Sequence, residues 1–321
     1  MPADPSIHVL LELPGGVSAA VRAMAAACER VDGSPPLSEE TLLELRRPDS
    51  RVLHLLAGHD SSDPDGYGFL RHAAHPRVSG VQEPAELEFM VAPDRRGHRA
   101  GTALLGRALV EAGSSGLMVW AHGTLPAARR LAETNGLVPL RRLLRLGREM
   151  AAQSGLATFP QHTPPTGFAL RTFRPGDEEA LLTVNAAAFA GHPEQGSLSA
   201  GGLAERMAEP WFDADGLLLA VRPADGGDED RIVGFHWTKI EPGEPEGAHP
   251  VGEVYVLGVD PNAAGHGLGS FLLAAGLESL ARRGVSRVHL YVEADNTVAR
   301  RMYEKAGFAL EVVDTRYATA A

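Results

Sequence analysis

The stretch from Gly252 to Phe308 constrains the fold of this chain more than any other part of the sequence. A strand-like run, GEVYVLGV, ends at Asp260-Pro261 and is followed by a glycine-rich turn and an amphipathic run. A second strand-like run, RVHLYV, leads to Asp295 and Asn296, either of which can cap a helix, and the helical segment after them stops at Gly307. Strand, turn, helix, strand and helix in this order predict an α/β fold built on a mixed sheet.

The alternation of side chains sets the expected faces of these elements. In the first strand, a period of two places Glu253, Tyr255, Leu257 and Val259 on one face and Val254, Val256 and Gly258 on the other. A glycine inside such a strand indicates a bulge or the close approach of another backbone. In the following helix, Leu268, Phe271, Leu272 and Ala275 recur at the spacing of a buried apolar stripe.

This order of elements occurs twice in the chain. ELEFMVAPDRRGHRAGTALLGRAL and PAARRLAETNGL in the first half parallel EVYVLGVDPNAAGHGLGSFLLAAGL and TVARRMYEKAGF in the second. The offset stays between 168 and 171 residues for the pairs Val91 and Val259, Gly101 and Gly269, and Gly136 and Gly307. The alternatives are a duplicated domain and coincidence between two α/β segments. We expect domains at residues 1–150 and 168–321, joined by a linker at 151–167 that carries three prolines.

The composition excludes several classes of function. The 321 residues are 44% hydrophobic and 22% charged, as in ordinary globular proteins, and the net charge of -11 argues against a basic nucleic-acid surface. The single cysteine, Cys28, forms no internal disulfide, and no His, Asp and Glu cluster has the spacing of a metal site. No segment has the pattern of a secretory signal or a membrane helix. We expect a cytoplasmic monomer that acts on small molecules, without a metal.

The glycine-rich turn predicts an anion site. In Ala264–Ser270, AGHGLGS, three glycines alternate at the start of a helix, whose free amides and dipole favour a phosphate. A P-loop would need a Lys after its last glycine, and a Rossmann fingerprint would need the spacing GxGxxG. A tight turn without a ligand is the remaining alternative.

Together these motifs resemble the GNAT acetyltransferase superfamily, with its glycine turn, its strand ending near Asn and its helix carrying Tyr before Gly-Phe. The strings AFAGHPEQG, EPWFDADGL, GFHWTKI, GEVYVLGVDP, LYVEADN, VDTRYA and WAHGT resemble more narrowly the mycothiol synthase family of tandem-GNAT enzymes. The resemblance implies two GNAT-like domains, each with a central, mostly antiparallel sheet, flanking helices and a splayed strand pair. It also implies acetyl transfer from acetyl-CoA to the cysteinyl amine of 1D-myo-inositol 2-(L-cysteinylamino)-2-deoxy-α-D-glucopyranoside (Cys-GlcN-Ins).

The resemblance assigns the acetyl-CoA contacts to two sets of residues. In the second half these are Leu257, Gly258, Val259, Ala264, Gly265, His266, Gly267, Leu268, Gly269, Ser270, Asn296, Thr297, Val298, Ala299, Arg300 and Arg301. In the first half they are Phe89, Met90, Val91, Arg96, Gly97 and Gly101. Main-chain groups of Leu257–Val259 would polarise the thioester carbonyl. Ala264 departs from the Gln or Arg of the family motif.

Two side chains match the family's acid and base. An α-amine has a pKa of ~7.7–8.0 and must lose a proton before it attacks a thioester, and Glu253 matches the residue that removes this proton. Tyr303 matches the general acid that protonates the departing CoA thiolate. A solvated Glu at a strand edge and a half-buried Tyr packed on the sheet are the alternatives.

The acceptor contacts implied by the resemblance are Glu39, Glu194, Lys239, Glu253 and Tyr291. Glu39 is equally typical of an acid in the first turn of a helix, and Lys239 of a solvated strand end.

The first half resembles a degraded copy. The alignment places Ala85, Ala132 and Leu125 where the second half has Glu253, Tyr303 and Asn296, and it places Arg99 where the second half has Gly267. We therefore expect this half to be non-catalytic, to support the fold, and to lend Glu39 to the acceptor site. A GNAT enzyme acting on another amine, such as a protein N-terminus or an aminoglycoside, and a non-catalytic acyl-CoA-binding module remain the alternatives.

Overall fold

The structure, a computed structural model, describes residues 5–45, 51–72, 83–150, 163–191, 195–223, 230–241 and 250–320. Most of the predicted linker, residues 151–162, and the predicted acceptor contact Glu194 lie outside these ranges. The chain forms two compact units, Met1–Leu144 with Val312–Ala321, and Arg145–Glu311. The division into domains at residues 1–150 and 168–321 stays a prediction.

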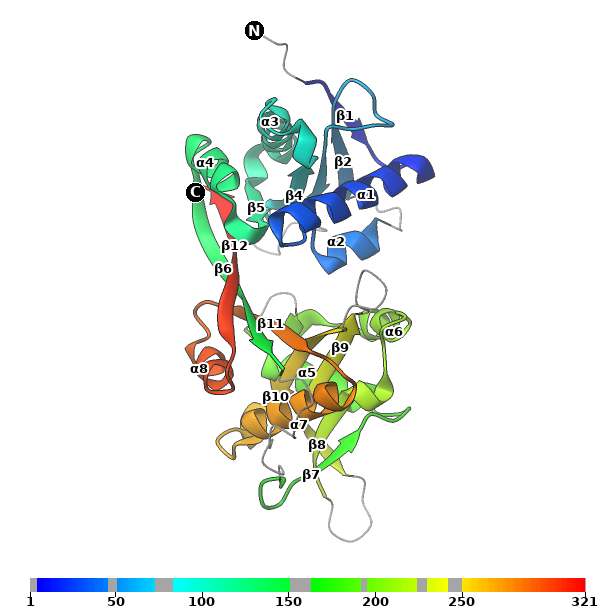
Figure 1. The fold of residues 1–321 in the computed structure, drawn as a ribbon, viewed down its shortest axis with the longest axis vertical. Helices are drawn as coiled ribbons and strands as arrows, with labels where there is room; N and C mark the ends of the chain where they lie inside the picture. Colours follow the sequence, from blue (N-terminus) through cyan, green and yellow to red (C-terminus); the bar gives the residue numbers. More distant parts are fainter. Residues whose placement is uncertain are drawn as a thin grey trace. The chain divides into compact units, whose positions relative to one another are not determined.

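The first unit is a mixed sheet covered on both faces. Its strands are β1 (Ile7–Leu10), β2 (Val52–Ala57), β3 (Gly66–Arg71), β4 (Ala85–Val91), β5 (Leu117–Ala121) and the first part of β6 (Leu137–Glu149). Its helices are α1 (Gly15–Asp32), α2 (Glu39–Glu44), α3 (Ala100–Ala112) and α4 (Pro126–Thr134). The apolar residues of α1 pack on one face of this sheet and those of α3 on the other (Figure 1).

The second unit repeats this plan. Its strands β7 (Ala169–Thr172), β8 (Leu217–Arg222), β9 (Arg231–Glu241), β10 (Val251–Val259) and β11 (Arg287–Glu293) lie in this order, and only β10 and β11 are parallel. Its helices are α5 (Glu178–Ala188), α6 (Ala200–Met207), α7 (Leu268–Arg282) and α8 (Thr297–Lys305). Each unit therefore has the predicted α/β architecture.

The last strand of each repeat belongs partly to the other unit. Strand β12 (Ala309–Thr319) follows α8, yet its residues from Val312 onward belong to the first unit and pair antiparallel with β5, Thr315 opposite Ala121. In return, β6 follows α4, but its residues from Arg145 onward belong to the second unit. The pattern of the sequence did not indicate this exchange.

The local sequence explains where the helices near the site begin and end. The predicted stripe of α7 is confirmed, since Leu268, Phe271, Leu272 and Ala275 are all buried. Gly284, just beyond α7, has φ +79°, which a residue with a side chain rarely adopts. The side chain of Asn296 accepts a hydrogen bond from the amide of Ala299 at 3.1 Å and so caps α8, as predicted.

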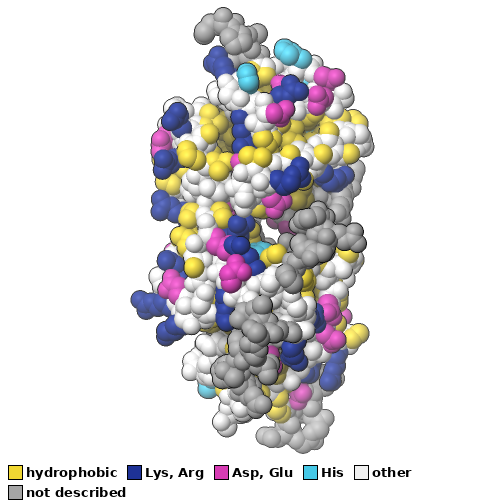
Figure 2. Space-filling view, in the orientation of Figure 1, with side chains coloured by type: hydrophobic (Ala, Val, Ile, Leu, Met, Phe, Trp, Pro, Cys, Tyr) yellow, Lys and Arg dark blue, Asp and Glu magenta, His cyan; other side chains and the backbone are white. Residues whose placement is uncertain are grey.

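Two general features of the described residues bear on function: the length of the helices and the distribution of charge. No helix among the described residues is long and apolar enough to cross a membrane. On the face drawn in Figure 2, basic and acidic side chains of the described residues are interspersed, and this view shows no basic stripe of the kind that follows a nucleic-acid backbone.

Candidate active site

The strands β10 and β11 separate partway along their length. They pair from Val251 opposite Arg287 to Val254 opposite Leu290, and the pairing then stops. Beyond this point β10 continues to Val259 with β9 as its partner, while β11 continues to Glu293. The predicted splayed pair is therefore confirmed. Such an opening offers main-chain groups of β10 to a ligand that adds to the sheet edge.

A β-bulge at Tyr255 corrects the predicted faces of β10. Val254 lies opposite Thr238 and Val256 opposite Trp237, so Tyr255 is an extra residue. An extra residue reverses the alternation beyond it. Glu253 consequently shares its face with Val256 and Gly258, and the prediction that it shares a face with Leu257 and Val259 is wrong.

The sheet register places Glu253 between two basic side chains. Its Oε2 lies 3.9 Å from Nζ of Lys239 on β9 and 3.9 Å from Nε2 of His289 on β11. The side chains of Lys239 and Glu253 are only 10% and 11% exposed. The ring of Tyr291 stands edge-on to that of His289, with 5.9 Å between the centroids. Three predicted acceptor contacts, Lys239, Glu253 and Tyr291, therefore share one face, and His289 joins them without having been predicted.

Two aromatic side chains, Trp211 and Tyr255, lie beside Lys239. Nζ of Lys239 lies 5.1 Å from the ring centroid of Trp211 and 5.7 Å from that of Tyr255, within the range of cation–π attraction. Arg206 on α6 donates a hydrogen bond from Nε to the hydroxyl of Tyr255 at 3.0 Å. Lys239 is thus a buried residue inside β9, which runs on to Glu241, and the alternative of a solvated strand end is excluded.

Gly258 has a packing reason to be glycine. A Cβ added there would lie 2.8 Å from Cε1 of Phe235, 3.1 Å from Phe189 and 3.2 Å from Ala188. These neighbours are side-chain atoms of β9 and of the end of α5, whereas the sequence indicated a bulge or the close approach of another backbone. A side chain at this position would push α5 away from β10.

The glycine turn has the geometry of an anion cradle. Gly265 and Gly267 have φ +84° and φ +77°, the left-handed region that favours glycine. The N-cap of α7 is Gly267, which has no side chain to accept a hydrogen bond from the first amides of this helix. The His266 ring stands edge-on to Phe168, with 5.7 Å between the centroids.

Helix α8 carries the predicted acid in its second turn. Tyr303 is buried against Phe308, with 5.9 Å between the ring centroids. Burial raises the pKa of Tyr303 to about 12, so the phenol keeps its proton at neutral pH. Arg300 donates a hydrogen bond to the carbonyl oxygen of Ala294 at 2.9 Å and thereby holds the loop that precedes α8.

The matching strand of the first unit has no bulge. Strands β3 and β4 stay in register from Arg71 opposite Glu86 to Gly66 opposite Val91. The residue that corresponds to Glu253 is therefore Glu86, which faces Arg71 as Glu253 faces Lys239, and the assignment of Ala85 to this position is wrong. The predicted alignment missed the extra residue of the bulge. Glu86 forms an ion pair with Arg316 of β12.

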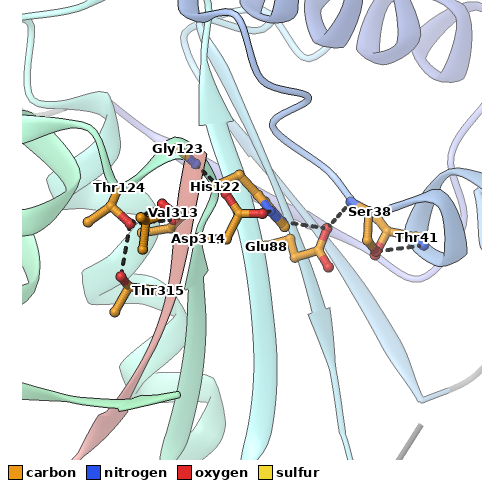
Figure 3. A network of polar contacts seen from close by, with 10 residues as sticks. Ser38, Thr41, Glu88, His122, Gly123, Thr124, Val313, Asp314 and Thr315 are labelled. Carbon is orange, nitrogen blue, oxygen red and sulfur yellow. Dashed lines mark hydrogen bonds and ion pairs between the residues drawn. The ribbon is translucent and has the colours of Figure 1, made fainter. Parts of the chain in front are cut away.

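The first unit carries a buried ion cluster near the end of β5 (Figure 3). His122 lies between two carboxylates: its Nε2 is 3.7 Å from Oε2 of Glu88, and its Nδ1 is 3.6 Å from Oδ2 of Asp314. The amide of Ser38 donates to Glu88 at 2.6 Å, and that of Gly123 donates to Asp314 at 2.6 Å. Burial alone would lower the pKa of His122, but the two neighbouring carboxylates, Asp314 and Glu88, raise it to about 10.

This cluster lies beside the last pair of β4 and β5. The pairing of β4 with β5 ends at Leu87 opposite Val119, so Glu88 lies on β4 just beyond the last pair, and His122 directly follows the end of β5. Because the His122 side chain is only 13% exposed, a charged imidazole with two carboxylates fills this place. The ion cluster therefore occupies the place in the first unit where the pairing of β4 with β5 ends.

The first unit keeps the backbone of the anion cradle. Gly97 and Arg99 have φ +81° and φ +68°, close to the values of Gly265 and Gly267. An Arg in this region costs roughly 1–2 kcal/mol. Both terminal nitrogens of Arg96 bind the carboxylate of Asp32 at 2.7 Å, and its Nε donates to the carbonyl of Val91 at 3.2 Å. This side chain is thus engaged within the protein.

The three remaining predicted residues belong to other elements or fall outside the described residues. Glu39 is in the first unit, in the first turn of α2, where an acid interacts favourably with the helix dipole. Glu194 is outside the described residues. Tyr303 lies on α8, and its place in the reaction stays a prediction. Among the residues that the structure describes, no group of three or more His, Cys, Asp or Glu side chains is arranged to hold a metal ion.

Comparisons with known proteins agree with this geometry. The model of the acetyltransferase (GNAT) family matches residues 194–308. The mycothiol acetyltransferase of Catenulispora acidiphila is 44% identical over 93% of this chain and 94% of its own length. That of a Nocardioides species is 46% identical over 92% of this chain and 95% of its own length. A tandem GNAT protein from the clavulanic acid biosynthesis pathway shares the fold, with a TM-score of 0.70 at 17% identity over 98% of both chains.

Proposed function

Since this chain belongs to the mycothiol acetyltransferase family, we propose that it transfers the acetyl group of acetyl-CoA to the cysteinyl amine of Cys-GlcN-Ins. The products are mycothiol and CoA. The observation that carries the proposal is the Glu253 carboxylate, which is buried beside the parting of β10 and β11 and lies 3.9 Å from both Lys239 and His289. Acetyl-CoA serves as the acetyl donor, and the reaction needs no metal.

Acetyl-CoA would enter between β10 and β11. Its pantetheine adds to the free edge of β10 at Leu257–Val259, where a main-chain amide polarises the thioester carbonyl. The pyrophosphate is held by the amides of the turn at 264–270, which the left-handed Gly265 and Gly267 open toward an anion. Residues Asn296–Arg301, at the start of α8, close the remaining side of the cofactor.

Glu253 acts on the acceptor amine. The ammonium gives one proton to a Glu253 oxygen, and the free amine then attacks the thioester carbon. When the tetrahedral intermediate collapses, the C–S bond breaks and the CoA thiolate takes the proton of the Tyr303 phenol. The second proton of the nitrogen restores that phenol. One proton in total leaves for solvent, as the stoichiometry of ammonium acylation requires.

Lys239 and Tyr291 would bind the acceptor beside the reacting amine. Both lie on the face of Glu253, and a sugar–inositol conjugate offers hydroxyls to an ammonium and a phenol. Glu39 and Glu194 stay predictions for this site.

The first unit would bind acetyl-CoA without turning it over. Its cradle at Gly97–Gly101 keeps the left-handed backbone, and Phe89, Met90 and Val91 line the corresponding strand. The ion cluster of Glu88, His122 and Asp314 fills the place where an acceptor would have to approach. Because Arg96 is held by Asp32, binding here would depend on backbone amides.

A thiol-release assay tests the proposal. The protein is given acetyl-CoA with Cys-GlcN-Ins, or with a panel of other amines that includes an N-terminal peptide and an aminoglycoside. We expect release of CoA thiol to be fastest with Cys-GlcN-Ins, and mass spectrometry to show one added acetyl group on its nitrogen. Faster turnover of another amine would replace the proposal with a GNAT enzyme for that amine. Binding of acetyl-CoA without turnover of any amine would replace it with a non-catalytic acyl-CoA-binding module.

A further inference from the structure

We propose that His289 is a positioning residue that orients the Glu253 carboxylate and receives from it the proton that the acceptor amine gives up. This inference rests on the proposed function. Its geometric basis is the register of the sheet, which sets His289 directly opposite Glu253 on one of the last rungs before β10 and β11 part.

The two side chains are close enough to exchange a proton after a small rotation. Nε2 of His289 lies 3.9 Å from Oε2 of Glu253, and the side chains are only 16% and 11% exposed. This separation exceeds a hydrogen bond, but catalytic hydrogen bonds often tighten only once the substrate is bound. The edge of the Tyr291 ring contacts the imidazole and limits the orientations that it can take.

The charges around Glu253 explain why a second acceptor of the proton is useful. On the side of β9, Lys239 stabilises the ionised carboxylate. On the side of α6, Arg206 reaches the group through the hydroxyl of Tyr255. A carboxylate is a weak base toward this amine, because an ordinary carboxyl pKa of ~4.3 lies far below the ~7.7–8.0 of an α-amine. A neutral imidazole, ordinarily near 6.5, is much closer in basicity to the amine.

The transfer of protons balances with His289 included. The first proton of the ammonium moves to a Glu253 oxygen and from there to Nε2 of a neutral His289. This leaves an imidazolium and an ionised carboxylate, and the free amine attacks the thioester. After the products have formed, the imidazolium gives its proton to water, which accounts for the one proton that the reaction releases.

The first unit provides an internal comparison. Glu86, the counterpart of Glu253, lies opposite Met118 on the matching rung of β4 and β5. A thioether therefore satisfies the packing of this rung in the first unit, so the fold does not require an imidazole there. The imidazole occurs in the unit that carries the splayed, bulged β10.

Substitution of His289 by Gln tests its role in turnover. We expect kcat to fall on the order of tenfold to a hundredfold and the acidic limb of the kcat/KM profile, which reports protonation of the imidazole, to disappear. The KM for acetyl-CoA should stay at the parental value, and imidazole added to His289→Ala should restore part of the rate. The matched control, Met118→Gln, should keep the parental kcat and pH profile. Parental kcat and pH profile in His289→Gln would overturn the inference.

A titration that needs no acceptor separates this inference from the proposed function. The His289 imidazole is followed by ¹H–¹⁵N NMR in the parent and in Glu253→Gln. Loss of the carboxylate should move the midpoint of the imidazole titration to lower pH by about one unit, because an anion within 4–6 Å favours the imidazolium. An unchanged midpoint would refute the coupling even if Cys-GlcN-Ins is acetylated. A lowered midpoint would sustain it even if another amine proves to be the acceptor.

Discussion

Replacement of His122 by Gln should destabilise the first unit strongly and in a pH-dependent way. The substitution removes the positive charge between Glu88 and Asp314 and leaves these two buried carboxylates without it. Breaking a buried ion pair from one side costs about 3–5 kcal/mol. Each carboxylate keeps one backbone amide at 2.6 Å, which compensates part of the loss, so we expect about 3 kcal/mol at pH 7.

The sign of the pH dependence follows from the shifted groups. The pKa of His122 is raised from 6.5 to about 10, so its stabilising effect is complete below pH 6.5 and is lost as the pH rises through about 10. Burial raises the pKa of Glu88, but His122 and the Ser38 amide lower it more, so the pKa is lowered overall. The stabilising contribution of the Glu88 carboxylate is therefore present above pH 4.5 and is lost as the pH falls. The parent cluster is therefore strongest between about pH 4.5 and 6.5. In His122→Gln the penalty shrinks toward acid, because one carboxylate then binds a proton.

Hydrogen exchange measured by mass spectrometry resolves this effect in the unit concerned. The opening free energies of β5 and β12 amides, paired from Thr315 opposite Ala121 to Ala318 opposite Met118, are compared in parent and variant at pH 5 and 7. The control triple variant, His122→Gln with Glu88→Gln and Asp314→Asn, removes all three charges and should recover most of the loss. A His122→Gln protein as stable as the parent at pH 7, or equally destabilised at both pH values, would refute the reasoning.

Two further substitutions test the backbone arguments. Gly258→Ala should lower the free energy of unfolding by about 1–3 kcal/mol and weaken acetyl-CoA binding, because its Cβ would lie 2.8 Å from Phe235. The control Gly106→Ala has open space around its Cβ and should be neutral or stabilising. Thermal unfolding and titration with acetyl-CoA compare the two variants. Arg99→Gly should raise the stability of the first unit by up to about 1–2 kcal/mol, because glycine relieves the backbone strain of the left-handed φ of +68°. An unchanged or lower unfolding midpoint in denaturant would show that contacts of the Arg99 side chain outweigh that strain.

The sequence predicted those parts of the structure that depend on local patterns. The apolar stripe of α7, the cap at Asn296 and the duplicated architecture all follow from short-range periodicity or from a repeated motif. The splayed strands and the fold family followed from motifs that the chain shares with its relatives. The grouping of Lys239, Glu253 and Tyr291 was implied by the same resemblance, and the registers of β9, β10 and β11 bring these three together.

The features that were missed depend on pairing between distant segments. The bulge at Tyr255 inserts one residue into a strand whose alternation looks regular in the sequence. For this reason the predicted face of Glu253 and its predicted match to Ala85 were both wrong. A change of the offset from 168 residues at Val91 and Val259 to 167 at Glu86 and Glu253 would have been the signal. His289 was read only as part of an alternating strand, and nothing local marks it as the neighbour of Glu253. The exchange of β6 and β12 leaves no pattern in the sequence.

The central claim is that Glu253 removes the proton of the acceptor amine beside a thioester held on the open edge of β10. Its most direct measurement is the kcat of Glu253→Gln with acetyl-CoA and Cys-GlcN-Ins, on protein first shown by titration calorimetry to bind acetyl-CoA. We predict a loss on the order of 10²–10⁴-fold in kcat with parental affinity for acetyl-CoA. Turnover at the parental rate by a variant that binds acetyl-CoA normally would contradict the account.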